Sequence, residues 1–559
     1  MSNADLPGWK PLTGLDEHGA NNGRLLAALL TTYDPPDPGI LIEEYLPVWL
    51  GLKNSYADEG NDRLRYFAEL EDALRRLKGR ISIVSSAGAV GTSAEAWIWN
   101  YIRRFEVGAV GTAVQHAKLW MFHRAPASDG ESETLEIVIS SGNLTRDGLR
   151  GQIQAGWRCI LQLDVGEPKG EWGLLPKFLN RLGAASGRSG PKTTDYWMGL
   201  LRRCQCPKGV EFIASVPGTH TAATLDQSRT PWGAAGLQAC LSGHGTRKMI
   251  AMAPTIGRWT PQSITAWTKF IGLEPDRISV AWVRKGHPWA SWWQLDPSTE
   301  KAMTDSRIQW LEVPCPDDDD WASPLCDDHQ KSDRRWSHAK VYELRQGVRR
   351  RILITSANLS RAAWGDPQSN GGLVIANFEL GVLMKVESGF ADRLSDVAFV
   401  RATCEIDYEQ TDEQPISWLA AEWDGDVLTV ECRTTSKGIL ASHVTVTTAR
   451  SKSGKRVSAD WSWSSDPLTR TKLSWLESDG VPVLIAVEAS DDHVRKTAVH
   501  DIRPNDNGEI LCGEFDEALL RETLDRLIEE RYGYASDPGS DGAGGHRRSD
   551  THGTKASAH

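Results

Sequence analysis

The sequence predicts an α/β fold made of two duplicated halves, followed by a C-terminal β-sandwich-like domain. Three observations support this prediction. Helix-like and strand-like runs are mixed as far as about residue 400, and one long motif occurs twice in distant parts of the chain. From about residue 415, short and often alternating runs replace the mixture. A chain of 559 residues allows roughly two to four domains.

The first half is predicted to cover residues 25–190, after a flexible leader at 1–24 that is rich in Gly, Asn and Asp. Its best helix is 61–78, because Asn61 suits the N-terminal cap and Gly79 suits the turn past the end. The segment 24–32 fits either a short helix or a buried strand. Strands are predicted at 81–85, 115–123, 135–140 and 159–163.

A linker is predicted at 181–192, where RLGAASGRSGPK is poor in apolar residues. The second half, residues 200–400, then restarts the pattern with a strand at 210–216 that ends in Pro-Gly. A helix is expected at 233–241. Further strands are expected at 248–253, 278–283, 338–344, 352–355 and 378–386.

The last folded part, residues 415–533, is predicted to be an accessory β-rich domain. Its runs VLTVECR, HVTVTTAR, VSADWSW, TKLSWLE and VPVLIAV are separated by turn residues. An amphipathic helix at 516–531 is expected to close it. The segment 536–559 is rich in Gly, Ser, Asp and His and is expected to be disordered.

Composition predicts a cytoplasmic protein. Nine cysteines are scattered along the chain, which favours reduced thiols. No apolar run reaches the roughly 20 residues that cross a bilayer, and the N-terminus does not resemble a signal peptide. A net charge of −11 argues against nonspecific coating of nucleic acid, although a locally basic cleft stays possible.

The repeated motif carries the chemistry. It reads QHAKLWMF…IVISSGNLTRDG in the first half and SHAKVYEL…ILITSANLSRAAWG in the second. Side chains two positions apart on a strand share a face, so each histidine should project together with its lysine. A hairpin then brings an asparagine alongside. The two predicted half-sites are His116, Lys118 and Asn143, and His338, Lys340 and Asn358.

Two such half-sites facing each other suit a phosphate diester. Lysine and asparagine donors can stabilise the charge of a five-coordinate transition state, so no metal or other cofactor is expected. One imidazole can attack phosphorus while the other protonates the leaving oxygen and then activates water. Ser141 and Ser356, which open the Ser-x-Asn turns, are expected to bind substrate. One His-x-Lys is weak evidence, whereas two copies in the same context are specific.

These motifs resemble the tyrosyl-DNA phosphodiesterase family, a branch of the phospholipase D superfamily. The superfamily pattern HxKx4D lacks its Asp here, because the corresponding positions are His123 and Arg345. A retained Asn without the Asp is the HKN pattern of that branch. The segment NFELGVL also resembles the family, and the likeness runs from about residue 25 to 400.

The resemblance implies two phospholipase D-like α-β-α half domains that form one site. It implies that His116 is the nucleophile and that His338 is the general acid and then the base. The lysines and asparagines would bind the phosphate. Gln154 would orient His338, and Glu379 would orient His116.

The resemblance implies a nucleic-acid partner, a single-stranded DNA 3′ end. In the run GHPWASWWQL, Trp289 and Trp292 are candidates to stack a base or a tyrosine, against the alternative that they are core residues. The acidic run 317–320 is expected to be a solvated loop. The C-terminal domain has no counterpart in the family core, and it either recruits a protein partner or substrate or only braces the enzyme.

The motifs admit four candidate functions. The absence of the HKD aspartates and of membrane segments counts against a lipid-directed phospholipase D, and the complete set of site residues counts against an inactive scaffold. Removal of an adduct from a DNA 3′ end is the first hypothesis. A nuclease that cuts DNA or RNA, as a bacterial defence effector, is the alternative, and the sequence does not separate the two.

Overall fold

The computed structural model describes residues 23–503 except 55, 57–60, 78, 88–96, 109–112, 149–151, 167–170, 228–229, 315–335, 396–398, 406–414, 435–439, 449–450, 464–467 and 490–492. The predicted leader up to residue 22, the acidic run, the helix at 516–531 and the disordered tail lie outside the described residues.

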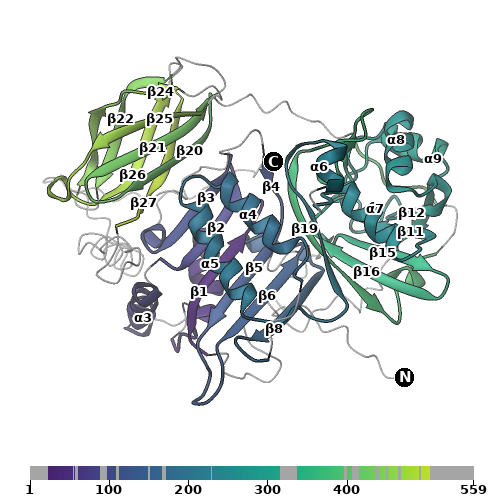
Figure 1. Ribbon diagram of the computed structural model, residues 1–559, viewed down its shortest axis with the longest axis horizontal. Coiled ribbons are helices and arrows are strands. Elements are labelled where there is room, and N and C mark those ends of the chain that lie inside the picture. Colours follow the sequence, from purple (N-terminus) through teal and green to yellow (C-terminus); the bar gives the residue numbers. More distant parts are fainter. Residues whose placement is uncertain are drawn as a thin grey trace, which may run out of the picture. The chain divides into compact units, whose positions relative to one another are not determined.

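The first sheet has the strand order β3-β2-β1-β5-β6-β8. Strands β1, β2 and β3 pair in parallel, and β5, β6 and β8 add antiparallel pairs on the other side of β1. Helices α4 and α5 lie across one face of this sheet (Figure 1). The segment 24–32, left open between helix and strand, is a strand. The elements are β1 (Leu25–Thr31), α3 (Asn61–Leu77), β2 (Ile81–Ser86), β3 (Ile102–Val107), β5 (Leu119–Arg124), β6 (Thr134–Ser140), β8 (Gly156–Gln162), α4 (Leu175–Ala185) and α5 (Gly190–Arg202).

The predicted linker at 181–192 is wrong, because α4 and α5 occupy most of it. A Cβ at Gly190 would collide with the Gly183 carbonyl, and one at Gly183 would collide with Thr194. The small residues therefore allow two helices to pack closely. Low apolar content, which suggested a linker, reflects this close approach.

The second sheet has the order β13-β12-β11-β15-β16-β19-β4, and β9 also pairs with β19. From β13 to β19 this repeats the order of the first sheet, with matching parallel and antiparallel pairs. The elements are β9 (Val210–Ser215), α7 (Ala234–Gly243), β11 (Lys248–Met252), α8 (Pro261–Ile271), β12 (Ile278–Trp282), α9 (Pro297–Asp305), β13 (Gln309–Glu312), β15 (Val341–Gln346), β16 (Arg349–Thr355) and β19 (Asn377–Val386).

The two sheets exchange short strands. Strand β4 (Val114–Gln115) from the first half pairs in parallel with β19 of the second. Strand β14 (Trp336–Ser337) from the second half pairs in parallel with β7 (Gln152–Ile153) of the first. One hydrophobic cluster correspondingly runs through both halves, from Ala27 to Ala402. The two duplicated segments therefore share a core.

Short elements complete this region. They are α1 (Pro38–Ile40), the π-helix Leu41–Tyr45, α2 (Leu46–Leu50), the 3-10 helices Trp97–Asn100, Pro275–Arg277 and Phe390–Arg393, β10 (Gly218–His220), α6 (Ala222–Gln227), α10 (Arg361–Trp364), β17 (Asp366–Pro367) and β18 (Leu373–Ile375).

The C-terminal strands form a sheet with the order β23-β22-β26-β27-β20-β21-β25-β24. It has a hydrophobic cluster of its own, which includes Trp423, Val430, Trp475 and Ile485. The strands are β20 (Ile416–Trp423), β21 (Val427–Thr434), β22 (Leu440–Thr448), β23 (Ser451–Ser458), β24 (Ser462–Trp463), β25 (Leu468–Ser474), β26 (Pro482–Ala489) and β27 (Val494–Asp501), with a 3-10 turn at Glu477–Asp479.

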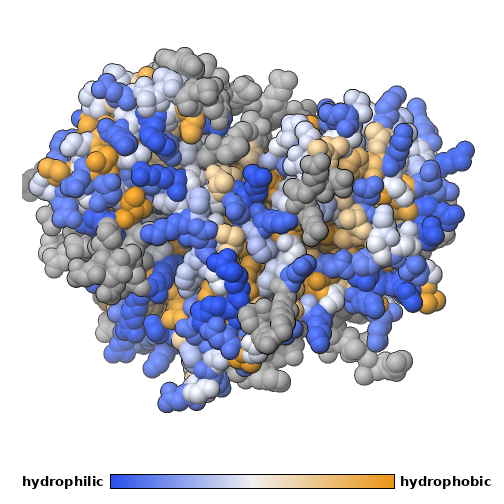
Figure 2. All heavy atoms as spheres, in the orientation of Figure 1, coloured by the Kyte–Doolittle hydropathy of each residue, from blue (hydrophilic) through white to orange (hydrophobic). Residues whose placement is uncertain are grey.

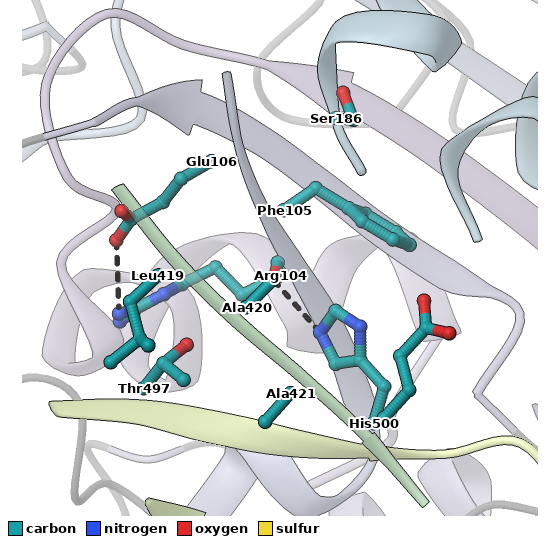
Figure 3. A pocket seen from close by; sticks show the side chains of 10 residues that line it. Arg104, Phe105, Glu106, Ser186, Leu419, Ala420, Ala421, Thr497 and His500 are labelled. Atoms are coloured by element: carbon teal, nitrogen blue, oxygen red, sulfur yellow. Dashed lines mark hydrogen bonds and ion pairs between the residues drawn. The ribbon is translucent and has the colours of Figure 1, made fainter. Parts of the chain in front are cut away.

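This sheet is bonded to β3, the edge strand of the first sheet. Trp418 Nε1 donates to the Glu106 carbonyl at 2.8 Å, and Arg495 pairs with the Glu106 carboxylate at 2.6 Å. Figure 3 shows the Arg104–Glu106 pair and the His500 ring directed at the Arg104 carbonyl, to which Nε2–H donates at 2.9 Å. These contacts cover an edge that would otherwise expose strand hydrogen-bonding groups.

The face seen in Figure 2 is mainly hydrophilic, with apolar side chains in small separate groups. Within the described part of the chain, no helix combines the length and the apolar character needed to cross a membrane.

Candidate active site

Each His-Ala-Lys segment lies where the chain passes from one half to the other. His116 follows β4, and its N–H donates to the Phe378 carbonyl of β19 at 3.1 Å. His338 follows β14, and its N–H donates to the Ile153 carbonyl of β7 at 2.9 Å. The strand predicted at 115–123 is therefore interrupted after Gln115 and resumes at Leu119, and the strand predicted at 338–344 begins only at Val341, because the chain changes partner at these segments.

His116 is held by a carboxylate from the other half. Its Nδ1 lies 2.9 Å from Glu379 Oε2. The Ser356 hydroxyl also donates to Glu379, and Asn377 Nδ2 donates to the second oxygen at 3.1 Å. Burial raises the pKa of Glu379, but the nearby His116 and Lys118 outweigh burial, so this pKa lies below its usual value. Glu379 is therefore ionised and fixes a proton on His116 Nδ1.

His338 is held by an amide and a carbonyl, also from the other half. Its Nδ1 lies 3.1 Å from the Ser141 carbonyl and 3.4 Å from Gln154 Oε1. The Ser141 hydroxyl donates to Gln154 Oε1 at 2.6 Å. Because a carbonyl can only accept, Nδ1 carries the proton, and Nε2 accepts from Lys340 Nζ at 2.7 Å. Both histidines therefore have Nδ1 bonded to a residue of the other half. The partner of His116 is a carboxylate, whereas the partners of His338 are uncharged.

The two lysines are fully buried. Lys118 Nζ donates to the His116 carbonyl at 2.7 Å, and Lys340 Nζ donates to the His338 carbonyl at 3.0 Å. Burial lowers the pKa of Lys118 to about 8. Burial and Lys118 place the pKa of Lys340 well below its usual value.

The imidazoles show the same effect. Burial is the main cause that lowers the pKa of both rings, and Glu379 partly offsets it at His116. Lys340, Lys118 and His116 add to the depression at His338. Groups from both halves therefore act on one another electrostatically. A bound anion would relieve this excess of positive character.

Asn143 contacts a carboxylate that the sequence reasoning missed. Its Nδ2 donates to Asp34 Oδ2 at 2.5 Å, and its Oδ1 accepts from the Tyr33 N–H at 3.2 Å. Asp34 also raises the pKa of both lysines against the effect of burial. Asp34 follows the end of β1, whose Thr31 hydroxyl donates to the Ala117 carbonyl at 2.7 Å, and no pattern in the sequence marks it.

Asn358 follows β16, as Asn143 follows β6. Its Oδ1 is buried, and no hydrogen-bond partner for it exists among the residues that the structure describes.

Aromatic rings flank both histidines. The Tyr33 ring meets His116 edge-on, with centroids 5.1 Å apart, and Trp336 meets His338 edge-on at 5.3 Å. Trp292 stacks on Trp336 with nearly parallel planes, at 5.5 Å, and is 53% exposed. The sequence reasoning selected Trp292 but missed Tyr33 and Trp336.

Three residues expected to bind substrate lie behind the site. Ser141 and Ser356 are fully buried, and their hydroxyls donate to Gln154 and Glu379. Trp289 is 8% exposed and packs against Trp293. Their hydroxyls or ring faces contact other side chains of the protein, and their binding of substrate stays a prediction.

The described residues contain no group of three or more His, Cys, Asp or Glu side chains arranged to hold a metal ion. The eight residues selected for chemistry instead supply imidazoles, ammonium groups and amides, together with one carboxylate.

The family model with the description "Tyrosyl-DNA phosphodiesterase" matches residues 102–271 and 287–419, which make up more than half of the chain and include all eight of these residues. Tyrosyl-DNA phosphodiesterase 1 of Drosophila melanogaster is 26% identical over 282 residues, which are 46% of this chain and 47% of the fly protein. The chain thus spans about half the length of this curated relative.

Solved structures are also similar. The crystal structure of the yeast tyrosyl-DNA phosphodiesterase aligns at 15% identity with a TM-score of 0.43, over 67% of this chain and 86% of the yeast chain. Polyphosphate kinase from Porphyromonas gingivalis aligns at 12% identity with a TM-score of 0.29, over 66% of this chain and 41% of that chain.

Proposed function

The chain belongs to the tyrosyl-DNA phosphodiesterase family, and from that membership we propose that it is a metal-independent phosphodiesterase that removes adducts from DNA 3′ ends through a phospho-histidine. The observation that carries this proposal is the crossed support of the histidines. Glu379 of the second half holds His116, and Gln154 of the first half holds His338. We take the two α/β sheets as phospholipase D-like half domains of one site.

His116 is the nucleophile in this proposal. With its Nδ1 proton bonded to Glu379, the opposite nitrogen Nε2 carries the lone pair and is more basic. Nε2 attacks phosphorus and forms a P–N bond, and the bond from phosphorus to the leaving oxygen breaks. His338 gives its Nε2 proton to that oxygen. His338 then takes a proton from water, the water oxygen bonds to phosphorus, and the P–N bond breaks.

The charge state of His338 depends on substrate. In the free protein, burial and the lysines hold its pKa well below the usual value, so the ring is neutral. A phosphate diester carries a negative charge that favours the protonated ring. Its partners Gln154 and Ser141 are uncharged acceptors, which leave the ring less basic than His116 and suit it to release a proton.

In this proposal the two lysines and two asparagines bind the phosphate. Lys118 and Lys340 provide charge, and Asn358 provides an amide. Asn143 uses one N–H on Asp34, which leaves the second N–H for a phosphate oxygen. Ser141 and Ser356 are positioning residues, because they bond to the groups that hold the histidines.

Four further features are proposed from the sequence. They are a single-stranded DNA 3′ end as substrate, a cytoplasmic location, a sandwich-like C-terminal domain and a protein partner for that domain. The bonds between this domain and β3 support a bracing role as well. A nuclease acting on DNA or RNA remains the second candidate, and the exposed Trp292 beside the site favours keeping it.

The test is a comparison of two oligonucleotides in EDTA, one ending in 3′-phosphotyrosine and one plain. Release of tyrosine that leaves a 3′ phosphate supports adduct removal, and internal cutting supports the nuclease. His116→Ala should abolish both reactions. His338→Ala should accumulate a covalent phospho-histidine adduct, seen as a shifted band on a gel. Full turnover by His338→Ala would show that the roles are assigned wrongly.

A further inference from the structure

Trp292 and Trp336 form a stacked unit, here called the tryptophan pair, that extends outward from His338. Trp336 contacts the His338 ring edge-on at 5.3 Å. Trp292 stacks on Trp336 at 5.5 Å with an interplanar angle of 1°. Trp292 is therefore two ring-to-ring steps away from the imidazole that is proposed to protonate the leaving group.

Hydrogen bonds of the neighbouring residues support the tryptophan pair. Trp293 is buried, and its Nε1 donates to the Ser337 carbonyl at 2.9 Å, immediately before His338. The N–H groups of Trp292 and Trp293 both donate to the Trp289 carbonyl, at 2.9 and 3.1 Å. These bonds anchor the backbone that carries Trp292, and its ring is ordered by stacking on Trp336. An aromatic ring that is already ordered loses little conformational freedom when it binds another ring.

The exposure of Trp292 is unusual within the described residues. No other tryptophan there has such a large exposed fraction, and 53% of Trp292 faces solvent. A large aromatic surface kept in water next to a reactive group is a common feature of binding sites. Stacking on an aromatic side chain is how many proteins hold a base of single-stranded nucleic acid.

We propose that Trp292 stacks the nucleobase of the nucleoside whose 5′ oxygen is the leaving group at this site. The inference rests on the proposed function, because it takes His338 as the acid on the leaving-group side. A phenol bonded directly to the leaving oxygen would place its ring beside His338. A base is separated from that oxygen by its sugar, which matches the position of Trp292 one ring further out.

Tyr33 provides the contrast on the other side. It is 42% exposed and meets the ring of His116, the proposed nucleophile. Tyr33 therefore lies beside the nucleophile and not beside His338, so it offers no ring on the leaving-group side. The tryptophan pair makes the site able to release a terminal nucleoside or to cut between nucleotides.

The experiment measures binding by calorimetry to the full chain. The probes are inorganic phosphate, deoxyribose 5-phosphate, and the 5′- and 3′-monophosphates of deoxyadenosine. With phosphate on Lys118 and Lys340, the 5′-nucleotide places its base on the leaving side and the 3′-nucleotide places it on the retained side. The variants are Trp292→Ala, Trp292→Phe, and the control Tyr196→Ala, which removes an aromatic ring that is 40% exposed and contacts His123.

Trp292→Ala should weaken the 5′-nucleotide by about 5- to 100-fold and leave the other three probes within about twofold. Trp292→Phe should restore most of the affinity, and Tyr196→Ala should change none of the four. Equal losses for all probes, or no loss for the 5′-nucleotide, would overturn the inference and leave the proposed function intact. Failure of inorganic phosphate to bind the unaltered protein would overturn both.

Discussion

Replacement of His500 by glutamine should remove an acid sensitivity from the joint between β3 and the C-terminal sheet. The His500 Nε2–H donates to the Arg104 carbonyl, and its ring meets Phe105 edge-on at 4.8 Å. Burial, with help from Arg103 and Arg104, lowers the pKa of His500 from 6.5 to about 4. His500→Gln keeps an N–H donor but cannot titrate.

Acid destabilises the folded protein at His500 because the unfolded chain binds a proton there more readily than the folded chain. Between these two pKa values the unfolded chain holds a proton on His500 that the folded chain rejects, so folding becomes less favourable as the pH falls. The stability is intact above about pH 6.5 and is lost progressively toward pH 4. The shift corresponds to at most about 3 kcal/mol, and the partly exposed edge of the ring makes about 1–3 kcal/mol the expected range.

Urea unfolding, followed by tryptophan fluorescence, tests this at about pH 7.5 and about pH 4.5. The emission averages over 24 tryptophans, among them Trp418, whose Nε1 donates to the Glu106 carbonyl at the joint. Acid effects on other groups are common to both proteins and cancel in the difference. The unaltered chain should lose about 1–3 kcal/mol more than His500→Gln on acidification. If both proteins lose the same amount, His500 is not a buried neutral ring and the reasoning fails.

Three further predictions concern the site. Ser356→Ala should lower kcat about 10- to 100-fold with little change in KM, because Glu379 loses a donor; an unchanged kcat in steady-state assays would contradict the positioning role. Asp34→Ala should tighten phosphate binding, because it removes a negative charge, and should slow turnover, because Asn143 loses its hydrogen-bond partner. Calorimetry measures the phosphate affinity and steady-state kinetics measures the turnover. A loss of both affinity and turnover would refute the prediction. Phosphate affinity should fall as the pH rises through about 8, where Lys118 deprotonates in the free protein, and binding near that pH should take up protons. Calorimetry in two buffers of different ionisation heat measures the uptake. Lys118→Met should take up fewer protons than the unaltered protein, and an equal uptake in both would contradict the prediction.

The family assignment and the main strands were predictable because they depend on local pattern. The family match confirms the resemblance seen in the two His-x-Lys and Ser-x-Asn motifs. The helix at Asn61–Leu77 and the strand at Thr134–Ser140 lie close to their predicted bounds. The linker failed because a composition poor in apolar residues has the same appearance in a flexible segment and in two closely packed helices.

The partners of the site residues were less accessible to sequence reasoning. Ser141 and Ser356 could be selected by their place in a motif, but whether a hydroxyl faces substrate or the interior depends on its neighbours. Asp34, Tyr33 and Trp336 belong to no repeated motif, so only their proximity to the histidines marks them.

The sequence by itself determined the chemical groups of this protein and their twofold repetition, since residue type and spacing along a strand are local properties. Only the tertiary structure decided that each histidine is supported from the opposite half, and that one support is a carboxylate while the other is an amide. The reason is physical: Glu379 lies 263 residues from His116, and Gln154 lies 184 residues from His338. Contacts over such separations arise from the strand exchange between two sheets, which no local pattern encodes.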